Sequence, residues 1–327
     1  MTHALILGAA GMVGARLAAK VAGSGAIGGR KLDRLTLVDI VEPGTPAAIA
    51  DGLAVRTMAV DISNPDTAET IVGMKPDIIV HLAAVVSGEA EIDFNKGYRV
   101  NLEGTLRLLE ALRAAQHAPR LVFTSSIAVF GAPFPPSIPD EFHHTPLTSY
   151  GTQKAMSELL IADYRRKGFV DAIGIRLPTI VVRPGKPNKA ASGFFSGIIR
   201  EPLNGLEAVL PVDPDVRHWM ASPTSAVGYL EHAASLDTDR LGGRPNLTMP
   251  GLSVTVREEI ECLEKVAGKA AVDLIRREPD EQIIKMVDGW AQSFDARRAL
   301  DLGFTTDADF EAIVRLYARD EGIELKG

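Results

Sequence analysis

Residues 4–14 read Ala-Leu-Ile-Leu-Gly-Ala-Ala-Gly-Met-Val-Gly, an apolar run that passes directly into a glycine-rich turn and a helical pattern. Glycines at the spacing G-x-x-G-x-x-G allow a tight turn, a close approach of the backbone to a pyrophosphate and close helix–strand packing. The start of the helix then offers free N–H groups to phosphates. The stretch predicts a dinucleotide site made by Gly8, Gly11, Met12, Val13 and Gly14; a glycine-rich turn without a ligand is the alternative.

Short apolar runs and longer helical patterns alternate through the first half of the chain. The predicted strands are 4–7, 35–38, 54–60, 78–81, 121–124 and 172–175, and the predicted helices are 13–21, 66–73, 94–115 and 150–167. Continuous apolar strands separated by helices indicate a parallel sheet that is covered on both faces. We therefore predict the α/β class, with a doubly wound nucleotide-binding domain over residues 1–178.

The alternation of predicted strands and helices ends after residue 178. Eight prolines between residues 184 and 250 divide the chain into short pieces, and clearer helical patterns follow only at 256–268 and 307–321. We predict a smaller substrate-binding domain over residues 179–327, some segments of which return to the first domain. It is expected to pack on the carboxyl ends of the parallel strands, where open α/β sheets bind ligands.

Composition limits the partners and the compartment. The 327 residues carry 35 Lys and Arg against 42 Asp and Glu, a formal net charge of −7, with no basic run for nucleic acid or an anionic membrane. The single cysteine, Cys262, fits a reducing compartment, and the apolar start is too short for a signal peptide or a spanning helix. His143 and His144 lack a third ligand at metal spacing. We expect a cytoplasmic protein with no metal, nucleic-acid or membrane partner.

Two acidic residues follow predicted strands at the cofactor edge. Asp39 ends the second long strand, where a carboxylate accepts hydrogen bonds from an adenosine ribose and opposes a 2′-phosphate, so it favours NAD over NADP. Its distance from the glycines is lengthened by an apparent insertion at 23–34. Asp61 and Ile62 follow the next strand, where a carboxylate can meet the adenine amino group. Solvated turns, or a helix cap at Asp61, are the alternatives.

A second cluster begins the predicted helix 150–167. Tyr150 and Lys154 are four residues apart and therefore project from one face of that helix. A free phenol, with a pKa of about 10, is a poor base at neutral pH, and a nearby ammonium favours the phenolate. Ser125 and Ser126 follow the predicted strand 121–124, at the edge where the reactive ring of a dinucleotide would lie.

Taken together, these motifs resemble the extended short-chain dehydrogenase/reductases. The matching stretches fall in order over residues 8–180: 8–14, Asp39, 61–62, 81–84, 101–105, 124–131, and Tyr150 with Lys154. The resemblance implies a Rossmann fold, a Ser126–Tyr150–Lys154 triad and a homodimer formed through the helices 94–115 and 150–167. It also implies bound NAD, contacted by Leu82, Ala83, Ala84, Asn101, Lys154, Leu177 and Pro178.

Two further stretches, 81–91 and 176–179, resemble family members that oxidise small sugar acids. Thr179 stands where sugar-nucleotide epimerases usually carry an asparagine, and residues 277–280 match an epimerase element only in part. The resemblance therefore implies oxidation of the C2 hydroxyl of a four-carbon acid, D-erythronate, to 2-oxo-tetronate. A UDP-hexose 4-epimerase and a non-catalytic NAD-sensing protein are the alternatives.

A small sugar acid needs a cation for its carboxylate, and a guanidinium can bind one with two parallel hydrogen bonds. Arg183 and Arg217 are the candidates, and surface ion pairs are the alternative for both. His218 is expected to be packed or solvated, because Tyr150 already fills the role of base. The complete predicted set of substrate-binding residues is Ser87, Ser125, Ser126, Tyr150, Thr179, Arg183 and Arg217.

Overall fold

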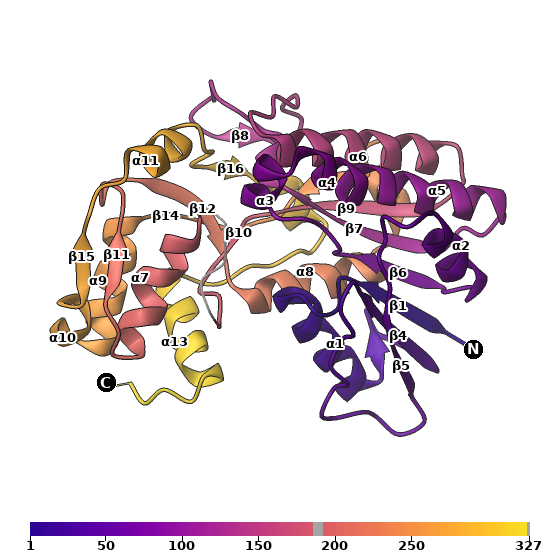
Figure 1. The fold of residues 1–327 in the computed structure, drawn as a ribbon, viewed down its shortest axis with the longest axis horizontal. Helices are drawn as coiled ribbons and strands as arrows, with labels where there is room; N and C mark the ends of the chain where they lie inside the picture. Colours follow the sequence, from indigo (N-terminus) through magenta and orange to yellow (C-terminus); the bar gives the residue numbers. More distant parts are fainter. Residues whose placement is uncertain (186–191, 326–327) are drawn as a thin grey trace.

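A seven-stranded parallel sheet, in the order β5–β4–β1–β6–β7–β9–β13, is the centre of the structure (Figure 1). The computed structural model describes residues 1–185 and 192–325. The strands are β1 (His3–Leu7), β4 (Arg34–Asp39), β5 (Ala54–Ala59), β6 (Ile78–His81), β7 (Arg120–Ser126), β9 (Asp171–Leu177) and β13 (Asn246–Thr248). All but β13 coincide with predicted strands, so the predicted α/β class is confirmed.

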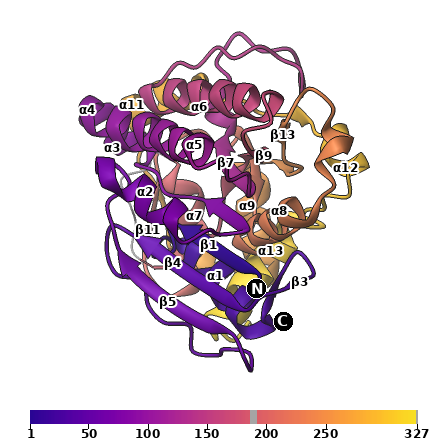
Figure 2. The same cartoon turned by 90° about the vertical axis from the view of Figure 1, so that its right-hand side faces the viewer.

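Helices cover both faces of the sheet because its strands are apolar on both sides. In β1, Ala4 and Ile6 face one hydrophobic core, whereas Leu5 and Leu7 face another. The first core is closed by α1 (Met12–Ser24) and α8 (Pro223–Ser235), and the second by α2 (Pro65–Gly73), α5 (Gly104–Ala114) and α6 (Ser149–Arg166). Figure 2 shows α5 and α6 side by side on their face of the sheet.

The predicted helix 94–115 is not one continuous α-helix, and that prediction was wrong. It divides into α4 (Phe94–Gly97), a π-helical turn η1 (Tyr98–Glu103) and α5. The wider turn places Asn101 inside, where its amide bonds the backbone of Val85 on both its N–H, at 2.7 Å, and its carbonyl, at 3.1 Å. Such π-helical turns are frequent at functional sites.

Two elements of the second half that the sequence did not reveal, α8 and β13, return to the large sheet. The prolines around them mark ends of elements rather than breaks in the fold. Pro223 is the first residue of α8, where a proline is tolerated because its missing N–H is not needed. Pro245 and Pro250 lie on either side of β13.

Most of the remaining segments after β9 build a separate hydrophobic core at the end of the molecule toward which the sheet's strands point (Figure 1). It contains the small sheet β10 (Thr179–Ile180), β12 (Arg217–Ala221) and β14 (Leu252–Thr255), packed with α7 (Gly193–Leu203), α9 (Val256–Ala267) and α13 (Phe310–Asp320). The other elements are β2 (Ala26–Ile27) and β3 (Arg30–Lys31), which form a hairpin in the apparent insertion, α3 (Ser87–Ile92), η2 (Ile127–Val129), β8 (Ile138–Pro139), β11 (Ala208–Leu210), η3 (Thr238–Leu241), α10 (Lys269–Val272), β15 (Ile275–Arg277), α11 (Glu281–Asp288), β16 (Phe294–Asp295) and α12 (Arg297–Asp301).

Candidate active site

The glycine-rich turn joins β1 to α1 and lies against the loop after β6. Gly8 has a φ of 89°, and a Cβ on it would stand 2.6 Å from a backbone nitrogen of that loop. A Cβ on Gly14 would stand 2.0 Å from the Gly8 carbonyl oxygen. Gly11 is the N-cap of α1, and in the described structure no side chain caps the N–H groups of its first turn, which Met12 and Val13 begin. The turn therefore fits a dinucleotide phosphate.

Asp39 lies beside this turn at the end of β4. Its Oδ2 accepts a hydrogen bond from the Ala10 N–H at 2.9 Å, and its Oδ1 accepts one from the Ile40 N–H at 2.7 Å. Asp61, after β5, accepts from the Ser63 N–H at 2.8 Å and so makes the turn into α2. Ile62 is buried in the core that α2 and α5 close, next to Gly104. Both carboxylates thus lie at the carboxyl edge of neighbouring strands, as a cofactor site requires.

The loop after β6 forms the next wall. Leu82, Ala83 and Ala84 are half-buried here, next to the glycine turn. Asn101 lies behind the loop rather than open to a ligand: its amide donates to the Val85 carbonyl and, at 2.7 Å, to Gln153 Oε1. The structure therefore gives Asn101 the position of a support for this loop.

Helix α6 carries the two central side chains. Thr148 caps it by accepting the Gly151 N–H at 3.0 Å, which fixes Tyr150 in the first turn and Lys154 one turn later. Lys154 Nζ donates to the Thr124 carbonyl at 2.8 Å and lies 5.8 Å from the centroid of the Tyr150 ring. Ser126, at the end of β7, interacts with the Tyr150 hydroxyl. The structure thus brings Ser126, Tyr150 and Lys154 together.

Burial opposes the charged forms of both groups on this helix face. It raises the pKa of Tyr150 to about 12, and the Ser126 hydroxyl partly offsets this. It lowers the pKa of Lys154 to about 7, and the negative charge of Glu158 partly offsets this. The expectation that Lys154 lowers the tyrosine pKa is therefore not met by the protein on its own, because desolvation is the larger effect.

Neighbouring strand ends bring further predicted residues to this place. Leu177, the last residue of β9, pairs in register with Ser126, and Pro178 follows it directly. Ser125 is 2% exposed, and its hydroxyl has no hydrogen-bond partner among the residues described. Ser87 begins α3, which packs against α6.

The candidate substrate residues beyond β9 are already engaged with the protein. Thr179 begins β10, and its hydroxyl lies 2.6 Å from His218 Nε2. Arg183 donates to the Ser192 hydroxyl at 3.3 Å, and burial lowers its pKa. Arg217 donates to the Ser253 carbonyl at 2.8 Å and lies 3.5 Å from Glu258. The structure does not bring the two arginines into contact with the Tyr150 cluster.

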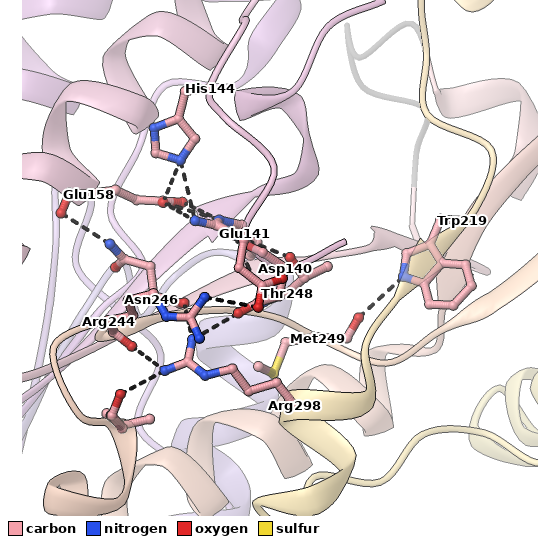
Figure 3. A network of polar contacts seen from close by, with 12 residues as sticks. Asp140, Glu141, His144, Glu158, Trp219, Arg244, Asn246, Thr248, Met249 and Arg298 are labelled. Atoms are coloured by element: carbon pink, nitrogen blue, oxygen red, sulfur yellow. Dashed lines mark hydrogen bonds and ion pairs between the residues drawn. The ribbon is translucent and has the colours of Figure 1, made fainter. Parts of the chain in front are cut away.

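Sequence reasoning missed a buried ionic network that includes Glu158, Asp140 and Arg298 (Figure 3). Glu158, one turn after Lys154 on α6, accepts from Arg176 of β9 at 2.8 Å and from His144 at 3.0 Å. Arg176 also donates to the Asp140 carbonyl at 3.1 Å, and the Asp140 carboxylate binds Arg298 of α12 at 2.8 Å. These ion pairs and hydrogen bonds hold α6 to β9 and α12. The only sequence signal for them is the four-residue spacing of Lys154 and Glu158, which places both on one face of the helix.

Within residues 1–185 and 192–325, no group of three or more His, Cys, Asp or Glu side chains is arranged to hold a metal ion. In the same residues, no helix is both long and apolar enough to cross a membrane.

Two of the curated relatives that match over nearly the full length are named D-erythronate dehydrogenases. The chain is 45% identical over 325 residues to a D-erythronate dehydrogenase of Cupriavidus necator, covering 98% of this chain and 99% of the relative. It is 41% identical over 313 residues to a D-erythronate dehydrogenase of Haemophilus influenzae, covering 96% and 98%.

Solved structures agree with the fold and add a different name. A structure described as a nucleoside-diphosphate-sugar epimerase from Agrobacterium tumefaciens matches with a TM-score of 0.96 and 58% identity, covering 99% of this chain and 96% of that one. An L-threonine dehydrogenase from Cupriavidus necator, with a TM-score of 0.83 over 98% of this chain and 99% of that one, is only 22% identical and shows the fold alone. The family model for NAD dependent epimerases and dehydratases matches residues 4–221. The chain therefore belongs to the NAD dependent epimerase/dehydratase family.

Proposed function

We propose that the protein is an NAD-dependent dehydrogenase that oxidises the C2 hydroxyl of D-erythronate to 2-oxo-tetronate. The observation that carries the substrate is the similarity, over nearly the full length, to two D-erythronate dehydrogenases. The reaction type is supported by the cluster of Ser126, Tyr150 and Lys154 at the carboxyl edge of the sheet. A positioned general base of this kind contributes about 100- to 10,000-fold to a rate.

In this proposal Tyr150 accepts the proton of the C2 hydroxyl, and Ser126 donates a hydrogen bond to the same oxygen. Lys154 holds its ammonium 5.8 Å from the tyrosine ring, where a positive charge favours the phenolate. NAD, when bound, would supply the acceptor for the C2 hydride and a second positive charge beside the tyrosine.

The described residues fit that cofactor. The turn from Gly8 to Gly14 would hold the pyrophosphate, and Asp39 would bind the adenosine ribose. Lys154 and the segment Leu177–Pro178 would meet the nicotinamide half. The fit is supported by the backbone contacts that leave no room for a Cβ on Gly8 or Gly14, and by the unpartnered, buried hydroxyl of Ser125.

For the substrate carboxylate we propose Arg217, with Arg183 as the second candidate. Both are cationic side chains in the part of the chain that follows β9. The ion pair of Arg217 with Glu258, at 3.5 Å and on half-exposed side chains, is a weak competitor that a carboxylate could replace.

A sugar-nucleotide 4-epimerase is the second candidate, favoured by the name of the 58%-identical structure. An assay with NAD separates the two, using D-erythronate, its stereoisomers and UDP-hexoses. A dehydrogenase accumulates NADH with the acid, whereas an epimerase converts the UDP-hexose without net NADH. NAD binding without turnover of any substrate would contradict both and leave an NAD-sensing protein.

We also propose a cytoplasmic homodimer that pairs through α5 and α6. Exposed apolar side chains on and near these helices support the dimer, namely Ile92, Phe94, Leu106 and Leu159. The single cysteine, Cys262, is free, which supports a reducing compartment such as the cytoplasm.

A further inference from the structure

The hydroxyl of Thr179 lies just beyond the catalytic edge and is held by one partner. Leu177, the last residue of β9, pairs in register with Ser126. Thr179 lies two residues further along the chain, just past this pair. Its Oγ1 lies 2.6 Å from His218 Nε2 on the neighbouring strand β12. The direction of this hydrogen bond decides what Thr179 can offer to a substrate.

The other ring nitrogen of His218 fixes that direction. Nδ1 lies 3.1 Å from the carbonyl oxygen of Ala291, which can only accept, so Nδ1 carries the proton. Burial lowers the pKa of His218 to about 4, so the ring is neutral at neutral pH. Nε2 is then an acceptor, and Thr179 must donate its only hydroxyl proton to it.

The ring of His218 is also held in place. It is 3% exposed, stacked on Phe195 of α7 with centroids 5.2 Å apart and 5° between the planes. Trp290 lies on it with centroids 5.2 Å apart. Side chains from α7 and from the loop after α11 therefore keep the imidazole pointing at Thr179.

We propose that His218 is a positioning residue that makes Thr179 a pure hydrogen-bond acceptor, and that Thr179 thereby selects a substrate with a hydroxyl on C3, next to the reacting carbon. This rests on the proposed oxidation at C2. The lone pairs on Thr179 Oγ1 accept a hydrogen bond from a C3 hydroxyl, and they repel a carboxylate oxygen. The same contact therefore turns the carboxylate away from Thr179.

The test compares kcat/KM for D-erythronate with that for 2,4-dihydroxybutanoate, which lacks the C3 hydroxyl, and for 2,3-dihydroxybutanoate, which lacks the C4 hydroxyl. Wild type should prefer D-erythronate over the C3-deoxy acid by at least about 3- to 10-fold, the value of one neutral hydrogen bond. In Thr179→Val, which keeps the shape, this preference should fall to about 1. Thr179→Ser should restore it.

His218→Phe keeps the stacked ring and removes the acceptor, so the C3 preference should again fall, by about threefold or more. None of these variants should change the C4 preference or the Kd for NAD. Thr306→Val, which removes a threonine hydroxyl bonded to Tyr229, is the matched control and should behave as wild type. If Thr179 and His218 had only a structural role, the variants would lower the preferences for the C3 hydroxyl and for the C4 hydroxyl together, or would change neither.

Nitrogen NMR of the labelled histidines gives a readout that needs no turnover. His218 should show a protonated Nδ1 and an unprotonated Nε2, and Thr179→Val should shift only Nε2. A protonated Nε2, or an unchanged C3 preference in Thr179→Val, overturns the inference. If wild type fails to oxidise D-erythronate, the proposed function fails instead, and the NMR result still decides the direction of the hydrogen bond.

Discussion

Tyr150 and Lys154 show at the scale of single residues how burial sets the chemistry of a site. Removal from water disfavours the charge of both, raising the pKa of the phenol to about 12 and lowering that of the amine to about 7. Burial therefore raises the free energy of the state with a charged ammonium beside a phenolate, and fixed charges nearby are needed to stabilise it. Glu158 supplies one such charge, because it raises the pKa of Lys154.

If Tyr150 is the base, Tyr150→Phe should lower kcat by about 100- to 10,000-fold, with the fold and the Kd for NAD unchanged. Tyr164→Phe is the matched control on the same helix, since the Tyr164 hydroxyl bonds Glu110 away from the site. Steady-state kinetics and fluorescence titration with NAD check both. Substantial turnover by Tyr150→Phe would remove Tyr150 from the role of base.

Asp39 should make NAD the preferred cofactor, because its carboxylate would face the 2′-phosphate of NADP. Asp39→Asn removes the charge and keeps an oxygen for the Ala10 N–H. The ratio of kcat/KM for NAD over NADP should fall by at least about tenfold in this variant. A wild type that prefers NADP would contradict the assignment.

Arg217→Ala should lower kcat/KM for the acid by at least about tenfold, because it removes a charged hydrogen-bond partner. Arg217→Lys should recover only part, since an ammonium cannot reproduce a two-pronged contact. Arg257→Ala, which removes an exposed ion pair with Asp215, is the control. The neutral alcohol erythritol should be a much poorer substrate than the acid in wild type and roughly equal to it in Arg217→Ala. If the acid keeps its advantage, the carboxylate binds elsewhere and Arg183 is tested next.

At the scale of elements, α6 is the part that unites catalysis with structure. Leu159 lies on the exposed side of this helix. Tyr150, Lys154 and Glu158 are spaced four residues apart and lie on the side that faces the sheet. The first two residues form the site, and the third ties the helix to β9 through Arg176 (Figure 3). The helix is therefore positioned by a buried ion pair rather than by apolar packing alone.

Glu158→Gln tests this tie. The partners of Glu158 hold its pKa at about 2 against an ordinary value of 4.5, so its contribution to stability is complete above pH 4.5 and is lost as the pH falls toward 2. The variant should lose about 3 kcal/mol at pH 7, and its difference from wild type should shrink toward pH 2. Urea unfolding at several pH values measures this. Asp163→Asn, at an exposed ion pair on α6, should change stability by less than about 1 kcal/mol. Equal losses at pH 7 and at pH 2–3 would contradict the role of the charge.

The elements that sequence could predict are those whose signal is local. The glycine turn, the apolar strands and the Tyr150–Lys154 spacing each lie within a few residues. Strand β13 could not be found, because three residues become a strand only by pairing with β9 about 70 positions earlier. The His218–Thr179 contact was hidden for the same reason, and η1 was hidden because one widened turn barely changes the helical period.

At the scale of the whole molecule, the site lies where two hydrophobic cores meet. Strand β7 supplies Ser126 and helix α6 supplies Tyr150 and Lys154, while Phe195 and Trp290 of the second core hold His218 in place. We propose on this basis that 1–178 is the NAD-binding domain and that 179–327 is mainly the substrate-binding domain, with α8 and β13 returning to the first. Selectivity for the acid is then expected to change with substitutions after residue 178, and NAD affinity with those before it.

The apolar surface of α5 and α6 is the last feature to need an explanation, because a helix that exposes such side chains to water gains by pairing. Leu159 is 64% exposed on α6, and Leu106 on the adjacent α5 is 36% exposed. If two copies pair here, Leu159→Glu would bury a charge in the interface, so the variant should be a monomer at concentrations where wild type is a dimer. Leu206→Glu places the same charge on a 59% exposed leucine away from these helices and should leave the dimer intact. Sedimentation velocity measures both. Because neither residue touches the Tyr150 cluster, a monomeric Leu159→Glu that keeps full kcat would show that each subunit has a complete site, whereas an unchanged dimer would move the interface to another face.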